Sequence, residues 1–301
     1  MGEPSAAKVI VGVDGSGESA DALALALTLS EARGARLWPV FVHPYGPLSR
    51  TLSESRYEEL VNELADSVHA QLKALELAPG ERTLQIVTDR SPAAGLQRIA
   101  EQEAAALIVV GGSRRSRVGR VLPGGSAERL LAGAPCPVAI APKGYADARA
   151  ELASVGTAFD GSEESRAALG WAAGLARSVH ARLCLVGVHV PLPPVTLEDG
   201  SGVQLTSANE RLRDELQEQL AEAEASVQEG EMDVASTLLD GNAAGQLAQA
   251  SERLDLLVVG SRGYGPLGAV VLGSVSNALV RTARCPLVVL PRSVKSWRPD
   301  G

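Results

Sequence analysis

Residues 260–274 read Gly-Ser-Arg-Gly-Tyr-Gly-Pro-Leu-Gly-Ala-Val-Val-Leu-Gly-Ser. An apolar run over Leu254–Val259 precedes this stretch, and helix-compatible sequence over Val275–Thr282 follows it. A buried strand, a glycine-rich loop and a helix form the arrangement that presents backbone N–H groups to a phosphate. Glycine lets a ligand approach the main chain closely, and Ser274 would add a hydroxyl donor. A single loop of this kind is still more simply explained as a flexible turn, so the rest of the chain has to decide.

The same pattern occurs a second time, because Gly112 to Gly125 repeats the spacing of Gly260 to Gly273. Three further landmarks return in the same order. They are Val11–Ser16 with Thr157–Ser162, Val40–His43 with Gly187–His189, and Cys136–Pro142 with Cys285–Pro291. Four matching landmarks predict two copies of one domain of about 150 residues. We place the first repeat at residues 1–147 and the second repeat at residues 148–301.

The composition of the 301 residues narrows the class of protein. The chain is 45% hydrophobic but only 3% aromatic, so valine, leucine and alanine must fill the cores, as suits strands covered on both faces. A net charge of −8 argues against general affinity for nucleic acid or anionic membranes. Three cysteines, an odd number, are interpreted as reduced, small apolar residues. With no signal peptide before Val9 and no run of membrane-spanning length, we expect a cytoplasmic protein.

Hydrophobic periodicity predicts five strands that alternate with helices in each repeat. Gly34 should end the first helix, Ser53 should cap the second, and His43-Pro44 should break the second strand. The second helix should bury a stripe made of Leu60, Leu64, Val68, Leu72 and Leu75. In the first repeat the predicted strands are Lys8–Val13, Arg36–Val42, Thr83–Val87, Ala106–Val110 and Cys136–Ala141, and the helices are Ser19–Arg33, Glu54–Leu77, Pro92–Glu103 and Ser126–Ala132.

The second repeat is predicted in the same order, with a proline-rich insert at Pro191–Val195. Its strands are Ser154–Phe159, Arg182–Val188, Ala235–Leu239, Asp255–Val259 and Pro286–Leu290, and its helices are Ser165–Val179, Ser207–Glu229, Ala243–Glu252 and Ser274–Thr282. The link at Pro142–Ala150 is short and polar, so the two repeats should touch. Alternation of strand and helix predicts a parallel sheet, whose ligands lie at the carboxyl ends of the strands.

With these landmarks in place, the chain resembles a tandem universal stress protein. The family's ATP signature is a glycine, two residues, a glycine, nine residues, a glycine and a serine or threonine, which Gly260, Gly263, Gly273 and Ser274 match. The opening Val-Gly-Val-Asp-Gly-Ser, the His at the end of the second strand and the Cys-Pro opening of the fifth strand are also typical. The resemblance implies flavodoxin-like α/β domains with strand order 3-2-1-4-5. It also implies adenine-nucleotide binding in many members and domain pairing along the last strand.

The resemblance also implies roles for individual residues. Asp160 would contact the adenosine part, Val188 would face the adenine, and the residues of the signature would hold the phosphates. The corresponding residues of the first repeat are Asp14, Val42, Gly112, Arg115, Gly125 and Ser126. Because Arg115 replaces the second glycine of the signature there, we expect the second repeat to be the tighter site.

Several of these residues also have simpler interpretations. Asp14 and Asp160 stand in Asp-Gly-Ser, which is ordinary turn sequence. His43 and His189 at strand ends are better explained as structural histidines than as catalysts. The cluster of arginines in the first loop fits either a solvated loop or an anion site made of guanidinium groups, and its members are Arg114, Arg115, Arg117 and Arg120.

The predicted function is that of a regulatory stress-response module that binds ATP or AMP, with Mg²⁺ as a candidate ion. The absence of a Gly-Lys-Ser or Gly-Lys-Thr after either loop argues against a P-loop nucleotidase. A nucleotide-free interaction or scaffold protein and a slow ATPase are the alternatives. The expected partners are the nucleotide, the other repeat of the same chain and a second chain in a homodimer, with no nucleic acid and no membrane.

Overall fold

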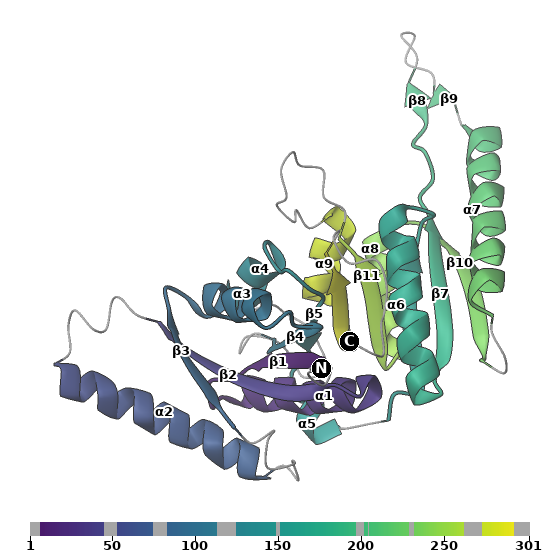
Figure 1. The fold of residues 1–301 in the computed structure, drawn as a ribbon. Coiled ribbons are helices and arrows are strands. Elements are labelled where there is room, and N and C mark those ends of the chain that lie inside the picture. Colours follow the sequence, from purple (N-terminus) through teal and green to yellow (C-terminus); the bar gives the residue numbers. More distant parts are fainter. Residues whose placement is uncertain are drawn as a thin grey trace.

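The computed structural model describes residues 7–44, 53–74, 83–112, 125–148, 151–196, 202–203, 205–228, 232–261 and 273–291. The first repeat contains β1 (Lys8–Gly12), α1 (Gly17–Arg33), β2 (Arg36–Pro44), α2 (Glu54–Ala74), β3 (Gln85–Asp89), α3 (Pro92–Gln102), β4 (Leu107–Gly111), α4 (Gly125–Leu131), β5 (Val138–Ala141) and α5 (Tyr145–Ala148). Each of the four helices predicted for this repeat starts within two residues of its predicted first residue. Figure 1 shows how these elements are arranged.

The second repeat follows the same plan with three short additions, two strands and a 3-10 turn. It contains β6 (Ser154–Phe159), α6 (Glu163–Val179), β7 (Arg182–His189), β8 (Val195–Thr196), β9 (Gly202–Val203), α7 (Thr206–Val227), β10 (Val234–Asp240), α8 (Ala243–Ala250), a 3-10 turn at Ser251–Arg253, β11 (Leu256–Gly260), α9 (Ser274–Thr282) and β12 (Leu287–Leu290). The predicted bounds of β6 and α9 are confirmed residue for residue.

The strand order of each repeat is the predicted 3-2-1-4-5, with every neighbouring pair parallel. The two sheets join through an antiparallel pair between β5 and β12, in which Val288 lies opposite Ala139. The result is one ten-stranded sheet that runs through both repeats. The prediction that the last strands meet is therefore confirmed. Because β5 and β12 cover each other's edges, a homodimer would have to use another surface.

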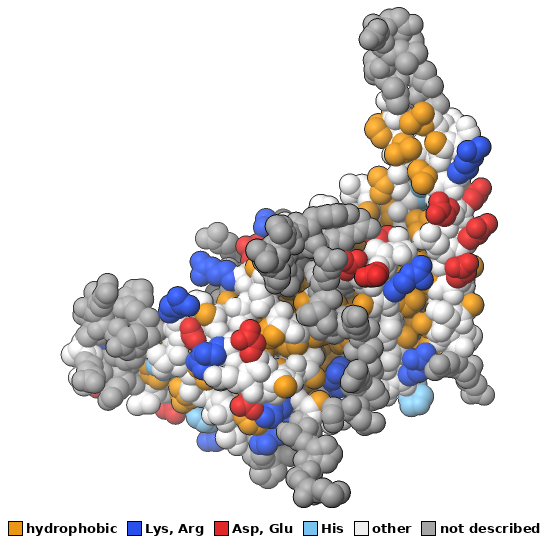
Figure 2. Space-filling view, turned by 45° about the horizontal axis from the view of Figure 1, so that its top comes forward, with side chains coloured by type: hydrophobic (Ala, Val, Ile, Leu, Met, Phe, Trp, Pro, Cys, Tyr) orange, Lys and Arg blue, Asp and Glu red, His pale blue; other side chains and the backbone are white. Residues whose placement is uncertain are grey.

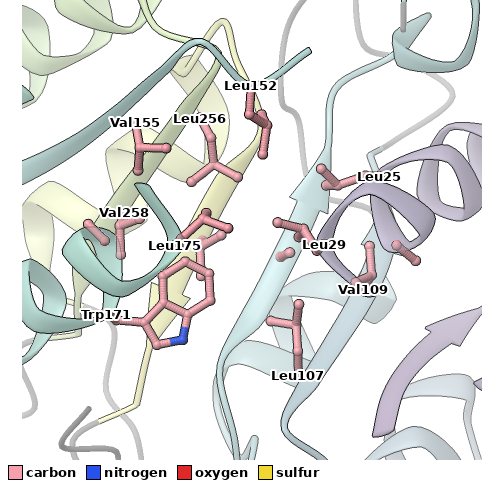
Figure 3. Packing of buried hydrophobic residues seen from close by; sticks show 14 of the residues in the cluster. Leu25, Leu29, Leu107, Val109, Leu152, Val155, Trp171, Leu175, Leu256 and Val258 are labelled. Carbon is pink, nitrogen blue, oxygen red and sulfur yellow. The ribbon is translucent and has the colours of Figure 1, made fainter. Parts of the chain in front are cut away.

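The apolar face under α1, α6 and α7 is continuous across the junction between the repeats. Leu25 and Leu29 of α1 pack over β4, while Trp171 and Leu175 of α6 pack over β6 and β11 (Figure 3). Leu152 lies between the two groups (Figure 3). The opposite face is covered by α3, α4, α8 and α9. Helices on both faces leave the strand ends as the accessible edge of the sheet.

Serine hydroxyls begin the two helices that follow the first strand of each repeat. Ser16 accepts from the backbone N of Ser19, and Ser162 accepts from that of Ser165, both at 3.2 Å. These N-caps start α1 and α6 two residues before the predicted Ser19 and Ser165. Gly34 ends α1 in the left-handed conformation with φ of 62°, as predicted.

Strand β2 corrects one prediction, since it continues through His43 to Pro44. β1 ends at Gly12, opposite Val40, so the last residues of β2 have no β1 residue beside them. The missing N–H of Pro44 therefore removes no ladder hydrogen bond on that side, and β3 continues the pairing with Asp89 opposite Pro44.

The second half of helix α2 lies over the turn after β1. Gln71 donates from Nε2 to the backbone O of Ser16 at 2.9 Å, and Val68 and Leu72 are buried. Leu64, one turn earlier, is 38% exposed, so the predicted stripe is wrong at this position. Leu75 lies outside the described residues, as does the side chain of Leu60.

Two short elements were not predicted. Helix α5 lies within the expected linker, where Asp21 of α1 accepts from the backbone N atoms of Gly144 at 2.8 Å and Ala146 at 2.9 Å. Strands β8 and β9 form a small antiparallel pair that begins at the end of the proline-rich insert. Neither element has a hydrophobic pattern of its own, so only the three-dimensional contacts reveal them.

The three cysteines have free thiols, and burial raises the pKa of each of them, that of Cys136 to about 12. Cys136 and Cys285 are buried, whereas Cys184 is half-buried. A thiol with a raised pKa forms little of the reactive thiolate at neutral pH. We therefore expect a disulfide reagent to label at most one thiol of the native chain, at Cys184, and all three after unfolding in guanidinium. Rapid labelling of two thiols in the native chain would contradict the burial.

Candidate functional site

A cavity of about 670 Å³ opens at the carboxyl ends of the strands in the second repeat. Its wall combines the ends of β6, β7 and β11 with the first turn of α9 and one side of α7. The size and the mixture of apolar and polar walls are those of a small-molecule site. All the described candidates of the second repeat line it, namely Asp160, Val188, Gly260, Gly273 and Ser274. Gly263 lies outside the described residues.

Asp160 holds the turn between β6 and α6. Its Oδ1 accepts from the backbone N of Ser162 at 3.1 Å and from the Ser162 hydroxyl at 2.5 Å. Gly161 between them has φ of 76°, which an L side chain rarely adopts. The turn interpretation of Asp160 is therefore confirmed, and the same carboxylate also lines the cavity.

Gly260 ends β11 directly against the first turn of α6. A Cβ atom at this position would lie 2.7 Å from the carbonyl O of Glu164 and 2.9 Å from its carbonyl C. The need for glycine here comes from the packing of strand on helix, a reason that the sequence pattern does not reveal. The Ser276 hydroxyl donates to the Gly260 carbonyl at 2.7 Å and ties α9 to the same strand end.

Gly273 is the N-cap residue of α9, with φ of −60° and ψ of 157°. Any residue can adopt this backbone, so a left-handed turn is not what requires glycine at Gly273. Within the part of the chain that the structure describes, no side chain caps this end of α9. The N–H groups of the first turn therefore border the cavity together with the positive end of the helix dipole.

His189 ends β7 and is 7% exposed. Its Nδ1 lies 3.0 Å from Oδ1 of Asp240 at the end of β10, and Nε of Arg213 on α7 lies 3.2 Å from the same oxygen. The hydrogen bonds from His189 and Arg213 lower the pKa of Asp240. The structural interpretation of His189 is thus confirmed for Nδ1, although the ring also lines the cavity.

Sequence reasoning missed the contribution of α7. Leu212, Leu216 and Gln219 line the cavity from this helix, while Leu220 below them is fully buried. The spacing of Leu212, Leu216 and Leu220 at every fourth residue was the available signal, because residues four apart share one face of a helix. The many charges of α7 hid this narrow stripe.

The strand pairing shows that the residue equivalent to Gly260 in the first repeat lies one position before the Gly112 that the sequence pattern indicates. Gly260 pairs with Leu290, and the equivalent pair in the first repeat is Gly111 with Ala141. A Cβ atom on Gly111 would also meet the backbone of an α1 residue, Glu18, at 2.2 Å. Gly111, rather than Gly112, therefore corresponds to Gly260.

The same offset puts Gly125, the first residue of α4, at the position of Ser274, the first residue of α9. The first repeat thus has no hydroxyl where the second repeat has Ser274. Arg115 and the other loop arginines lie outside the described residues, and so does the side chain of Ser126.

The remaining candidates of the first repeat lie where the repeat predicts. Asp14 accepts from the backbone N of Ser16 at 3.0 Å, in a turn equivalent to the one that Asp160 holds in the second repeat. Val42 is buried near the end of β2. His43 differs from His189, because its Nε2 lies 2.8 Å from the Thr88 hydroxyl. Burial lowers the pKa of His43.

Two kinds of feature do not occur among the described residues. No described helix has the length and apolar character that crossing a membrane requires. Among the same residues, no group of three or more histidine, cysteine, aspartate or glutamate side chains is arranged to hold a metal ion.

Comparison with known proteins gives one consistent family. The model of the Universal stress protein family matches residues 6–142 and again residues 153–291. A universal stress protein of Mycobacterium tuberculosis H37Rv is 30% identical over 301 residues, which cover 95% of this chain and 97% of that protein. One from Thermus aquaticus is 35% identical over 133 residues, 43% of this chain and 94% of its own. The crystal structure of a universal stress protein from Archaeoglobus fulgidus superposes with a TM-score of 0.63 at 20% identity, covering 95% of this chain and 98% of that one.

Proposed function

Because the chain belongs to the universal stress protein family, we propose that its second repeat binds an adenine nucleotide, ATP or AMP, as a regulatory module of a stress response. One observation carries the proposal. A single cavity connects the uncapped first turn of α9 with the apolar end of β7, and the carboxylate of Asp160 lies on its wall. An anion site, an apolar wall and a polar group are what a nucleotide requires.

The phosphate end of the ligand belongs at α9. Gly273 and Ser274 border the cavity, and the N–H groups that follow them point out of a nine-residue helix at its positive end. The Ser274 hydroxyl adds a donor that no described residue uses. Phosphate oxygens would accept from these groups, as they do at other helix N-termini.

The nucleoside end belongs on the other side of the cavity. Val186 and Val188 of β7, Leu216 of α7 and Leu247 of α8 offer apolar contact to a flat base. Asp160 directly follows β6, which lies between β7 and β11 in the sheet, and its carboxylate would accept from a ribose hydroxyl.

The charges of the wall favour a metal-complexed nucleotide if the ligand is ATP. Asp160, Glu164 and Glu215 all line the cavity, and their negative charges would repel a bare triphosphate. Carboxylate and phosphate oxygens are the ligands that Mg²⁺ prefers. We therefore propose Mg²⁺·ATP as the triphosphate form that binds, with Asp160 and Glu164 as candidate carboxylate ligands of the ion.

The first repeat is proposed to be the weaker site. Its loop has arginine near the second glycine of the signature, and Gly125 replaces the hydroxyl of Ser274. Its anion-binding capacity would then depend on guanidinium groups rather than on close backbone contact.

A scaffold function is the second candidate, and exposed apolar residues favour it. Val190 is 55% exposed, Leu192 is 42% exposed and Leu212 is 43% exposed. Figure 2 shows hydrophobic side chains gathered where the projecting segment that carries β8 and β9 leaves the body of the second repeat. Exposed apolar groups of this kind mark protein contacts. Leu212 also lines the cavity, so a bound nucleotide would alter the surface offered to a partner.

The test is to identify what the purified full-length chain carries. One sample of the protein is denatured in acid, and the released small molecules are identified by mass spectrometry. A second, folded sample from which bound small molecules have been removed is given Mg²⁺·ATP and assayed for phosphate release. We expect ATP or AMP in the released fraction and little phosphate. Absence of nucleotide, together with no binding of added ATP or AMP, would favour the scaffold; steady phosphate release would favour the slow ATPase.

A further inference from the structure

The proline-rich insert of the second repeat begins with a run of exposed residues. Residues 190–194 read Val-Pro-Leu-Pro-Pro, and all five of them are exposed. They belong to no helix or strand and connect the end of β7 to the start of β8 (Figure 1). A continuous run of exposed apolar side chains of this kind marks a surface that contacts another molecule.

The prolines restrict the backbone of this run to one conformation. Each proline ring holds its own φ at about −65°, and the residue before a proline is driven out of the helical region toward polyproline II. Val190, Leu192 and Pro193 each precede a proline. The run therefore favours the extended polyproline II form, which has no internal hydrogen bonds and loses little conformational entropy when it binds.

Helix α7 holds the middle of the run by its backbone. The backbone N of Leu192 donates to Oδ1 of Asn209, in the first turn of α7, at 2.7 Å. Nδ2 of the same Asn209 donates to the carbonyl O of Leu192 at 3.4 Å. The Leu192 side chain stays 42% exposed, so these two hydrogen bonds fix the run without covering it. A segment that is already fixed costs less to order when a partner binds.

The spacing of the prolines places them on two neighbouring ridges. Polyproline II has three residues per turn, so residues three apart lie on the same ridge. Val190 and Pro193 share one ridge, Pro191 and Pro194 share the next, and Leu192 lies on the third. Two ridges of apolar side chains and rigid rings match a groove between aromatic side chains, which is how proline-rich segments are recognised.

We propose that residues 190–194 are a docking segment for a partner protein whose groove is lined by aromatic side chains, of the kind found in SH3 domains. The segment contains no lysine or arginine, and Glu198 and Asp199 follow it in the sequence, so the rim of the groove should be neutral or basic. This inference deepens the second candidate function, the scaffold, by naming the chemistry of its partner. It does not depend on nucleotide binding.

The first repeat contains the same proline spacing without the docking segment. Pro44 and Pro47 are three residues apart, as are Pro191 and Pro194. Pro44, however, is part of β2 and pairs with β3, and Gly46 directly precedes Pro47. A proline inside a sheet is not free to enter a groove, and glycine does not hold the polyproline II form. The double substitution Pro44→Ala/Pro47→Ala is therefore a matched control within the same chain.

The experiment adds the full-length chain to a ¹⁵N-labelled SH3 domain whose groove has no acidic rim, and follows the indole N–H signal of a groove tryptophan by NMR. We expect this signal to shift, and a proline-rich peptide that fills the groove to reverse the shift. Pro191→Ala/Pro194→Ala should weaken binding roughly 10-fold or more, because both rings lose apolar contact. Asn209→Ala should weaken it roughly 2- to 10-fold, because the segment is no longer fixed. Pro44→Ala/Pro47→Ala should leave it unchanged.

Circular dichroism of each variant verifies that the chain is folded. An unchanged tryptophan signal with the folded wild-type chain, or equal binding by the folded Pro191→Ala/Pro194→Ala chain, would overturn the docking segment. Either result would leave the proposed nucleotide binding standing, because a calorimetric titration of the same chain with Mg²⁺·ATP measures it separately. Failure of that titration, with the tryptophan shift intact, would overturn nucleotide binding and leave the docking segment standing.

Discussion

Replacing Gly260 with alanine should lower the free energy of unfolding by about 1–3 kcal/mol, the usual effect of an extra methyl group in a packed interior. The new Cβ would lie 2.7 Å from the carbonyl O of Glu164, which is backbone and cannot rotate away. The first turn of α6 would have to move off β11, and with it the turn that holds Asp160. Guanidinium titration followed by circular dichroism measures the change.

Gly170 provides the control for this substitution. It lies on the exposed side of α6, and a Cβ there would meet nothing within 4 Å. Gly170→Ala should therefore stabilise the chain by roughly 0.5–1 kcal/mol, since alanine favours a helix interior over glycine. Gly111→Ala, with the corresponding contact to Glu18, should behave like Gly260→Ala. Equal stability of the Gly260→Ala and Gly170→Ala chains would refute the close packing at β11.

Gly273→Val is expected to reduce the affinity for Mg²⁺·ATP roughly 10- to 100-fold, because each lost hydrogen bond to a charged group contributes about 1.5–3 kcal/mol. The side chain would fill space in front of the first turn of α9, where the cavity is lined by backbone. The fold should survive, because φ of −60° suits valine as well as glycine. Affinity is measured by calorimetry on the full-length chain.

The equivalent substitution in the first repeat is Gly124→Val, by the offset that relates Gly111 to Gly260. This variant should keep nearly the full affinity if the second repeat is the tighter site. Unchanged ATP binding by a folded Gly273→Val chain would show that the phosphates do not lie at α9.

The architecture could be predicted because it depends on short sequence patterns that act locally and occur in both repeats. The apolar runs fixed the strands, and the Asp-Gly-Ser and Cys-Pro landmarks gave the same order in both halves. Gly34 ended its helix as a left-handed cap, which depends only on the residue itself. The pairing of β5 with β12 followed from the need to cover two apolar edges.

The prediction failed where distant residues decide the structure. Helix α5 depends on Asp21, more than a hundred residues earlier in the chain, and the exposure of Leu64 depends on which half of α2 meets the turn at Ser16. The one-residue error at Gly112 arose because two glycine pairs, Gly111 with Gly124 and Gly112 with Gly125, have the same spacing as Gly260 with Gly273. Only the register of β4 with β5 distinguishes the two pairs.

The sequence predicted which glycines and strand ends belong to the candidate site, but it did not predict which side chains of α7 form the cavity wall. The side of α7 that faces the cavity was hidden among charges, and His189 was interpreted as structural on chemistry alone. The second nitrogen of a histidine cannot be assigned from sequence, because its partner comes from the neighbouring strand. Here that strand supplies Asp240, whose Oδ1 lies 3.0 Å from Nδ1 of His189.

The central claim is that one repeat of the chain, the second, binds an adenine nucleotide tightly. The most direct test is the stoichiometry of Mg²⁺·ATP binding to the stripped full-length chain, measured by titration calorimetry at protein concentrations well above the dissociation constant. The account predicts one tight site per chain, which Gly273→Val removes and Gly124→Val does not. Two equal sites, or one site that is lost in Gly124→Val and kept in Gly273→Val, would contradict it.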